Sequence, residues 1–341
     1  MSIDPYETRT LLGVLEQVKP IQRFFLNTFF KEENTFDTLH VDVDIVKGSR
    51  RVAPFVSPLL EGKVVKNEGF VTETFKPGYI KVKNVITPMN VFKRKAGQTI
   101  YTKPKSPALL AAEHVGKTLS KLTEMADRRE ELMAASAILN GGVEIKGDGL
   151  DRYVDFQMSP NHKVLLAGDA LWTSANSNPM KQLDAWCRLV LQDSGHRPSY
   201  CVMGIDAVYA FLDHPKVKEH LELRRNYTIE VRPKDLPQGV VLEAYIEKLK
   251  LNIVSYNEWY LNEDTGLEES IVPANRIALC SETARCSKNY GAIEDFDVTY
   301  GVKHFAKTWK QKDPSALFLL LQAAPLPVPH EIDAFLNAVV I

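Results

Sequence analysis

The sequence predicts an α+β protein whose parts are arranged along one long helix. Three observations lead to this prediction: an amphipathic repeat over residues 106–142, strand-like stretches on both sides of it, and alternating helix and strand patterns over residues 166–290. Strands that are grouped apart from a long helix are typical of α+β proteins. With 341 residues, the chain is long enough for two or three hydrophobic cores.

The long helix has clear signals at both ends. Ser106 is a suitable N-cap, Pro107 suits the first helical position, and Gly141-Gly142 supplies the left-handed exit. Apolar residues recur at three- and four-residue steps: Val115, Leu119, Leu122, Met125, Ala126, Leu132, Met133, Ala135 and Leu139. The other side is polar: Lys117, Lys121, Glu124, Asp127, Arg128 and Glu131. A helix of roughly 50 Å exceeds one small core, so it braces an elongated structure or lies across several neighbours. An ordinary amphipathic core helix is the alternative.

Residues 1–60 do not show the pattern of a compact domain, and we expect an N-terminal arm there. A short helical pattern ends at Pro20, and four phenylalanines follow: Phe24, Phe25, Phe29 and Phe30. This segment has much apolar material and little that could cover it locally. Two placements are open for the phenylalanines. They pack under the core of their own chain, or they dock on another subunit, which is the interface that we predict.

Residues 61–102 show the alternation of an extended ribbon. Residues 70–75 and 80–84 alternate, and Pro77-Gly78 between them suits the two central positions of a type II turn. An isolated two-stranded ribbon is only marginally stable in water. We therefore expect a neighbouring molecule to support it, with four residues near the predicted turn at the contact: Phe75, Pro77, Gly78 and Tyr79.

The remaining chain divides into three parts. Residues 103–165 contain the long helix and a hairpin, with strands near 143–145 and 153–156. Residues 166–290 read as an α/β or α+β domain that is inserted between two parts of the first domain. Residues 291–341 return to the first domain, and the fully apolar run 317–321 suits a buried central strand beside the long helix.

Composition excludes several classes of protein. The formal net charge of −1 argues against a protein that condenses nucleic acid, so any contact with DNA should be independent of sequence. We expect no signal peptide, no membrane-spanning stretch and therefore a cytoplasmic site of synthesis. The cysteines lack the spacing of metal ligands and suit free thiols in a reducing compartment: Cys187, Cys201, Cys280 and Cys286.

No motif makes a case for catalysis, and we expect no enzyme activity, no cofactor and no metal. The sequence has no Gly-rich phosphate loop, and its histidines sit singly; His214 and His220 are six residues apart and fall on different faces of a helix. The cluster Glu294-Asp295-x-Asp297 suits a solvated turn better than a cation site. An enzyme with a site built from Asp151, Asp155 and Glu294-Asp295 remains the alternative from another functional class.

Taken in order, several stretches resemble the major capsid proteins of lambda-type tailed phages, a family with the HK97-like shell fold. The first is Phe75-Lys76-Pro77-Gly78-Tyr79-Ile80-Lys81, which is similar to the family's Pro-Gly-Tyr turn in the extended loop. The long helix contains Glu130-Glu131 and an alanine-rich run, 134–139, followed by glycine, as family spine helices do. Further similar stretches are Val56-Ser57-Pro58, Val217-Lys218, Leu223-Arg224-Arg225, Ala284-Arg285, Tyr290-Gly291 and Ala323-Ala324-Pro325-Leu326.

This resemblance implies an α+β, HK97-like subunit with an N-terminal arm, an extended β-hairpin loop, a peripheral domain holding the spine helix, and an inserted axial domain. It implies a major capsid protein of a tailed phage or prophage, which self-assembles into hexamers and pentamers of an icosahedral shell around double-stranded DNA. Scaffolding, portal and decoration proteins are possible partners in that family. The expected location is the virion capsid, assembled in the host bacterial cytoplasm. An encapsulin-like, protein-storing shell of the same fold is the closest alternative.

Overall fold

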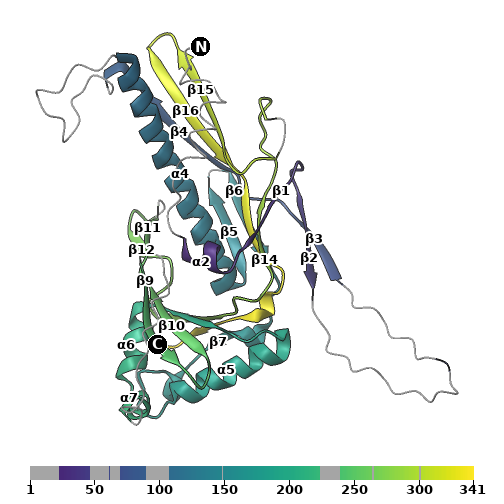
Figure 1. Cartoon of the computed structure of the whole chain (residues 1–341), viewed down its shortest axis with the longest axis vertical. Coiled ribbons are helices and arrows are strands. Elements are labelled where there is room, and N and C mark those ends of the chain that lie inside the picture. Colours follow the sequence, from purple (N-terminus) through teal and green to yellow (C-terminus); the bar gives the residue numbers. More distant parts are fainter. Residues whose placement is uncertain are drawn as a thin grey trace, which may run out of the picture.

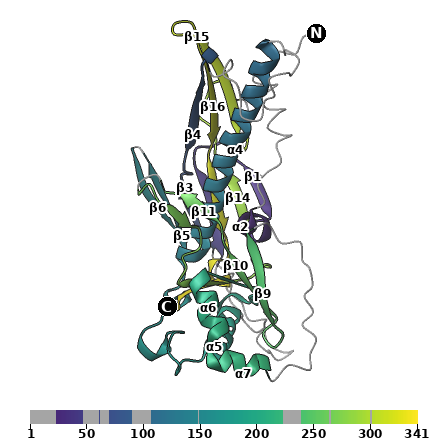
Figure 2. The same ribbon diagram turned by 90° about the vertical axis from the view of Figure 1, so that its left-hand side faces the viewer.

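In the computed structural model, one long helix forms the axis of an elongated molecule (Figures 1 and 2). The structure describes residues 23–46, 61, 70–89, 107–147, 149–222, 239–262, 265–298 and 301–341. Helix α4 spans Pro107–Asn140, which confirms the long helix predicted from the sequence. It ends at Gly141, whose φ of 71° is a left-handed conformation that costs glycine little.

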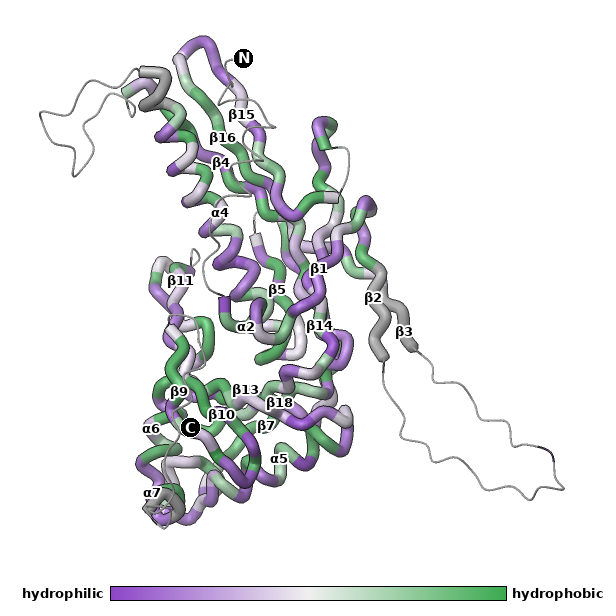
Figure 3. Tube along the Cα trace, in the orientation of Figure 1, coloured by the Kyte–Doolittle hydropathy of each residue, from purple (hydrophilic) through white to green (hydrophobic). Residues whose placement is uncertain are grey.

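Beside the first half of α4 lies a three-stranded antiparallel sheet. Its order is β15-β16-β4, with bounds Phe305–Gln311, Ala316–Ala323 and Ile80–Ile86. One face of this sheet packs on the apolar stripe of α4, through residues that include Val115, Leu119, Leu319 and Leu321. β16 is the central strand, as the apolar run 317–321 predicts, and it is the most continuously hydrophobic strand of this sheet in Figure 3.

Around the second half of α4 lie shorter elements from distant parts of the sequence. Hairpin β5-β6 (Gly142–Gly147 and Leu150–Asp155) follows the helix directly, as predicted. Helix α2 (Phe24–Thr28) also contacts α4. A three-stranded sheet has the order β1-β14-β17, with bounds Glu32–Thr35, Cys286–Tyr290 and Pro325–Pro329.

A six-stranded sheet covered by helices forms the other end of the molecule (Figure 1). Its order is β7-β18-β13-β8-β10-β9, with bounds Lys163–Leu165, Phe335–Val339, Arg276–Cys280, Tyr200–Met203, Leu251–Tyr256 and Val240–Ile246. The helices are α5 (Pro179–Ser194), α6 (Ile205–Asp213) and α7 (Pro215–Glu222). A separate small hairpin pairs β11 (Trp259–Leu261) with β12 (Glu268–Ser270). The described residues also form the 3₁₀ turns η1 (Pro160–His162), η2 (Gly168–Ala170) and η3 (Ile332–Ala334).

The strand pairing of the extended ribbon differs from the sequence prediction. β3 (Phe70–Phe75) pairs with β2 (Val41–Val46), whereas β4 joins β16 in the sheet beside α4. Pro77-Gly78 is therefore a connection between two sheets, and it is not the tip of the ribbon. The alternating pattern located the strands correctly, but it contains no information about which distant strand each one meets.

The last strand also departs from the predicted division of the chain. β18 pairs with β13 and β7 inside the six-stranded sheet, so residues 335–339 belong with the inserted domain. The segment 291–341 is consequently shared: β15, β16 and β17 lie with α4, and its end completes the other sheet.

Candidate functional site: the junction of the arm and the long helix

The described part of the N-terminal arm, residues 23–46, is attached to α4 by a buried contact that we call the junction. Its apolar part contains the four phenylalanines that the sequence analysis placed at a subunit interface. At most 1% of each of Phe24, Phe25, Phe29 and Phe30 is exposed. The ring of Phe24 lies 6.0 Å from that of Tyr200 and 5.8 Å from that of Tyr256, both in the six-stranded sheet. This packing favours the alternative in which the phenylalanines fill the core of their own subunit.

The polar part of the junction begins with three carboxylates of α4. Asp127, Glu130 and Glu131 are spaced i, i+3 and i+4, which puts them on one face of the helix. The sequence pattern assigned Asp127 and Glu131 to the polar side, where solvent is the default. In the structure the arm covers this face, and all three residues are buried. Buried carboxylates require charge or hydrogen-bond partners, and the arm supplies them.

Arg23 pairs with two of these carboxylates. Its Nη1 atom lies 2.9 Å from Asp127 Oδ1 and 2.9 Å from Glu130 Oε2. The hydroxyl of Tyr290, on β14, donates a further hydrogen bond to Glu130 Oε2 at 3.1 Å. Burial disfavours the charge of Arg23, but the neighbouring carboxylates outweigh it and the pKa of the guanidinium is raised. Arg23 therefore stays charged and joins the arm to the long helix.

Glu131 holds the start of helix α2. Its carboxylate accepts backbone N–H bonds from Phe25 at 2.7 Å and from Leu26 at 3.1 Å, and the hydroxyl of Tyr256 donates a third bond at 3.1 Å. Arg23, the N-cap residue of α2, makes no capping bond from its side chain to the first turn, so Glu131 satisfies backbone donors that would otherwise be buried unpaired. Burial raises the pKa of Glu131 even though these bonds favour the ionised form.

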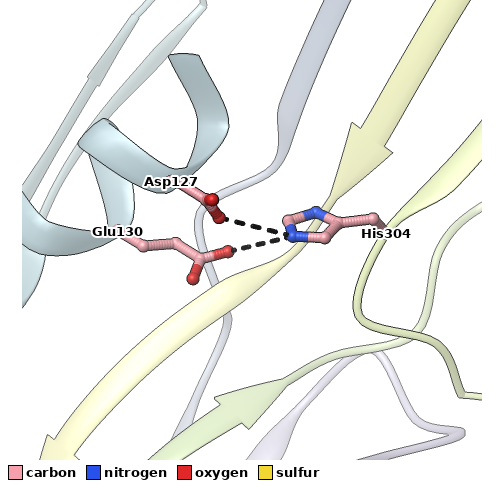
Figure 4. A group of neighbouring side chains, drawn as sticks. All are labelled: Asp127, Glu130 and His304. Carbon is pink, nitrogen blue, oxygen red and sulfur yellow. Dashed lines mark ion pairs between the residues drawn. The ribbon is translucent and has the colours of Figure 1, made fainter. Parts of the chain in front are cut away.

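His304 closes the junction from the side of β15 (Figure 4). Its Nε2 atom lies 3.7 Å from Asp127 Oδ1 and 3.8 Å from Glu130 Oε1. Burial opposes ionisation of Asp127, but the nearby ring of His304 and the charge of Arg23 outweigh it, so the pKa of Asp127 is lowered.

The residue types of Asp127, Glu130 and His304 would suit a divalent metal, and their ligand atoms lie within 4.8 Å of one another. However, the guanidinium of Arg23 already contacts both carboxylates and supplies the positive charge that a metal would bring. We therefore treat the group as an ion-pair cluster.

The predicted contact residues of the ribbon are also held by their own subunit. The ring of Phe75 packs 5.8 Å from that of Phe156, and Pro77 is buried. A Cβ atom on Gly78 would lie 3.1 Å from Ile145 Cγ2, so glycine allows the close approach to β5. Tyr79 is half-buried; its hydroxyl donates to Gln322 on β16, and burial raises its pKa to about 12. A contact of these residues with a second subunit stays a prediction.

The described residues bring serine and histidine together at Ser177–His214 and at Ser287–His330, where the hydroxyl of Ser287 donates to Asn289 Oδ1 at 3.1 Å. Ser177 Oγ lies 3.0 Å from Nε2 of His214, and both residues are buried. The Nδ1 atom of His214 accepts the backbone N–H of Lys216 at 3.2 Å, so the ring proton is on Nε2. A ring nitrogen that carries its proton cannot accept one from the serine, and the pair stabilises the loop before α5.

Two acidic residues of the alternative enzyme hypothesis, Asp155 and Asp295, have structural partners of their own. Asp155 lies on β6 and accepts the N–H of Gln157, and Asp151 is exposed on the same strand. Asp295 pairs with Lys307 at 3.1 Å and accepts a bond from Gln322. The ammonium group of Lys307 thus takes the place of a cation at the 294–297 turn.

A cavity and four buried thiols are further candidates for chemistry. A cavity of about 290 Å³ lies between α5, α6, α7 and β9, with Met180, Phe211, Val217 and Ala244 in its lining. Its surface is mostly apolar. The four cysteines are free and buried, and burial raises the pKa of their thiols, to about 11 for Cys187, so none of them is an activated nucleophile.

Among the described helices, none is long and apolar enough to cross a membrane.

Comparison with known proteins agrees with the fold and with the resemblance. The family model of the phage major capsid protein E matches residues 7–340. The major capsid protein of Enterobacteria phage P21 is 29% identical over 342 residues, covering 97% of both chains. That of Escherichia phage lambda is 28% identical over 346 residues, covering 97% of this chain and 98% of the other.

A solved structure shares the fold over its whole length. The crystal structure of a protein assigned as a prophage capsid protein of E. coli CFT073 superposes with a TM-score of 0.75 at 20% identity, covering 100% of both chains. The predicted α+β, HK97-like capsid fold is thereby confirmed. The match of the family model over nearly the whole sequence shows that this chain belongs to the phage major capsid protein E family.

Proposed function

We propose that this protein is a major capsid subunit that self-assembles into the icosahedral shell of a phage or prophage. The observation that carries the proposal is the family match over residues 7–340, together with a fold shared along the full length of a capsid protein. Relatives of the chain are named major head protein or major capsid protein.

The two-stranded pair of β2 and β3 fits a subunit that assembles with copies of itself. β2 and β3 pair with each other, and among the described strands no third one joins them. Figure 1 shows the pair beside the body of the subunit, at the side away from the small β11-β12 hairpin. A two-stranded ribbon gains stability when a further surface covers one of its faces. In our proposal a neighbouring subunit supplies that surface.

The finer parts of the proposal concern partners and location. Subunits form hexamers and pentamers in the host cytoplasm, and these close a shell around double-stranded DNA. The shell then becomes part of the virion. With a formal net charge of −1, the chain brings no large positive field to the DNA, so the packaged genome is held by confinement and not by sequence-specific contacts. Scaffolding, portal and decoration proteins are candidate additional partners.

Electron microscopy of the full-length protein, expressed alone and with the head genes of its phage, tests the proposal. We expect closed shells, tubes or hexameric rings. A protein that stays monomeric at high concentration under both conditions would contradict the proposal. Shells filled with one protein cargo and free of DNA would instead favour an encapsulin-like compartment of the same fold.

A further inference from the structure

The β11-β12 hairpin presents an apolar face to solvent. Trp259 is 55% exposed and Leu261 is 62% exposed, and residues two apart on a strand lie on the same face. Tyr260, on the opposite face, packs against the core that contains the junction, and its hydroxyl donates to Glu269 Oε2 at 2.9 Å. The hairpin is therefore fixed to its own subunit by one face and offers the other face to a partner.

Hydrogen bonds hold this hairpin in shape. Asn262 Nδ2 and Thr265 Oγ1 both donate to Glu269 Oε1, at 2.9 Å and 3.2 Å. These bonds tie residues from the connection between the strands to β12. A surface that is already formed loses little conformational entropy when it binds, so the exposed face is preorganised for a contact.

The hairpin is strongly acidic. Residues 259–270 contain no lysine or arginine and have four carboxylates: Glu263, Asp264, Glu268 and Glu269. Glu268 pairs with Leu261 across the two strands, and directly paired residues share a face. The partner that fits this hairpin is therefore an apolar surface with positive charge at its edge.

The cavity between α5, α6, α7 and β9 is such a surface. Its volume of about 290 Å³ is at the lower end of the range for ligand sites, about 300–1,000 Å³, so it suits one or two side chains better than a large cofactor. Lys181 and Lys248 belong to its lining, are exposed, and have no ion-pair partner among the described residues. The carboxylate of the lining, Asp184, is paired with Arg188 at 2.9 Å. The uncompensated charge at the cavity is thus positive.

The hairpin is too far from the cavity of its own subunit to fill it. β9 and β10 pair from Val240–Tyr256 at one end to Ile246–Leu251 at the other. The hairpin leaves the sheet just after Tyr256 and lies toward α4, whereas the cavity adjoins Ile246 and the helices (Figure 1). The two ends of β9 are about 20 Å apart. A hairpin that occupies the cavity must come from another molecule.

We propose that the exposed face of this hairpin docks into the cavity of a second copy of the chain. Trp259 and Leu261 enter the apolar space, and the carboxylates around them face Lys181 and Lys248. One copy gives the hairpin and the next gives the cavity, so the contact is heterologous, and its repetition forms a ring where the rotation between copies closes. The contact rests on the proposed function, since it names surfaces through which assembling subunits meet.

Photo-cross-linking in particles assembled from the full-length protein tests the contact. A photo-reactive phenylalanine analogue replaces Trp259. Subunits labelled with a heavy nitrogen isotope are mixed with unlabelled ones before assembly, so that mass spectrometry separates links between copies from links within one. We expect the analogue to link to the cavity lining, residues 178–184 or 244–249, of another copy.

The two proposals fail in different ways in this experiment. Shells in which the analogue links only to other surfaces, to its own copy or to a different head protein would overturn the docking contact and leave the capsid proposal standing. A subunit that never assembles and gives no link between copies would overturn both.

Truncation of the aromatic side chain measures its contribution. Trp259→Ala should raise the protein concentration needed for assembly roughly tenfold, because buried tryptophans are among the residues that dominate interfaces. Its urea unfolding should match the wild type, since the side chain is more than half exposed in the subunit. Leu165→Ala is the control: Leu165 is 79% exposed on β7, at the opposite edge of the sheet, and this variant should assemble like the wild type. Wild-type assembly of Trp259→Ala would overturn the contact.

Charge reversal separates docking from a folding defect. Lys181→Glu combined with Lys248→Glu should lower the yield of the cross-link roughly fivefold, because the cavity then repels the acidic hairpin. Adding Glu268→Lys places a positive charge beside Leu261 and should recover part of the yield, which a damaged fold would not do. A double variant that cross-links like the wild type, or a triple variant that recovers nothing, would contradict the docking contact.

Discussion

The two halves of α4 are held by different kinds of interaction. The first half is buried along one stripe against a single sheet: Val115, Thr118, Leu119, Leu122, Thr123 and Ala126. The second half is buried on several sides: Asp127, Glu130, Glu131, Met133, Ala134, Ala135, Ala137, Ile138 and Leu139. The first half is held by apolar side chains that pack against one face of a sheet. The second half is held by apolar packing together with paired charges.

The difference follows from what surrounds each half. The second half contacts α2, β5, β13, β17 and β18, which come from the arm, from the segment directly after the helix and from the last third of the sequence. Alanines at 134, 135 and 137 allow these elements to approach the helix closely. Elements that enclose a helix also cover its polar face, and polar groups there must find partners within the protein. The ion-pair cluster is therefore a consequence of enclosure, and substitutions in the two halves should have different effects.

The largest effect is expected from Arg23→Ala in the second half. Removing Arg23 leaves Asp127 and Glu130 buried without their cation, which costs about 3–5 kcal/mol of the free energy of unfolding. Urea unfolding of the subunit measures this loss. Arg188→Ala is the matched control, because its pair with Asp184 is on the surface and its side chain is 76% exposed; we expect at most about 0.5 kcal/mol there. Equal losses in the two variants would mean that the buried cluster does not stabilise the arm.

A smaller but substantial loss is expected from Leu319→Ala in the first half. Leu319 is fully buried between β16 and α4, and truncation of such a leucine costs about 2–4 kcal/mol through lost burial and the cavity it leaves. Val85→Ala, on a residue of the same sheet that is 41% exposed, should cost less than about 1 kcal/mol. In contrast to Arg23→Ala, the loss in Leu319→Ala should be insensitive to salt, and a strong salt dependence would argue against a purely apolar contact.

One pair of identical residues compares the halves most directly. Met133, in the enclosed half, is 6% exposed, whereas Met125, near the end of the first half, is 49% exposed. We expect Met133→Ala to lower the free energy of unfolding by about 2–3 kcal/mol and Met125→Ala by no more than about 0.5 kcal/mol. Comparable losses would show that enclosure of the second half contributes little beyond the apolar stripe.

Features set by local sequence were predictable. The ends of α4 follow from Pro107 and Gly141, and the central strand β16 follows from its unbroken apolar run. The hairpin after the helix was located from alternation around Gly147-Asp148-Gly149. Each of these depends on backbone preference or on side-chain periodicity within one segment, which is the information that a short stretch contains.

Features set by distant segments were not predictable. Pro77-Gly78 has the residues of a hairpin turn, yet the strands before and after it pair with 41–46 and 316–323. Arg23 and His304 gave no signal of their own, because an isolated arginine or histidine is usually on the surface. A signal did exist on α4: three carboxylates at i, i+3 and i+4 that precede an alanine-rich run indicate a polar face within a closely packed helix. Their partner could not be identified from sequence, because the arm lies more than 100 positions away.

Lowering the pH should also distinguish the two halves of α4, and the expected change in the free energy of unfolding is the smallest of those considered. The pKa of Asp127 is lowered from its ordinary value of 3.8, so its ionised form contributes stability that is complete above this value and is lost as the pH falls through the lower, folded pKa. Glu131 acts in the opposite direction, because its raised pKa makes protonation favourable to the folded state. We expect Asp127→Asn to remove on the order of 1 kcal/mol of the wild-type change in unfolding free energy between neutral pH and about pH 3. Leu319→Ala should keep the full wild-type change, since none of the residues described as buried in the first half of α4 is a carboxylate. If Leu319→Ala flattened the acid response as much as Asp127→Asn does, the charges of the junction would not be its source, and the contrast between an apolar half and an ion-paired half of α4 would no longer hold.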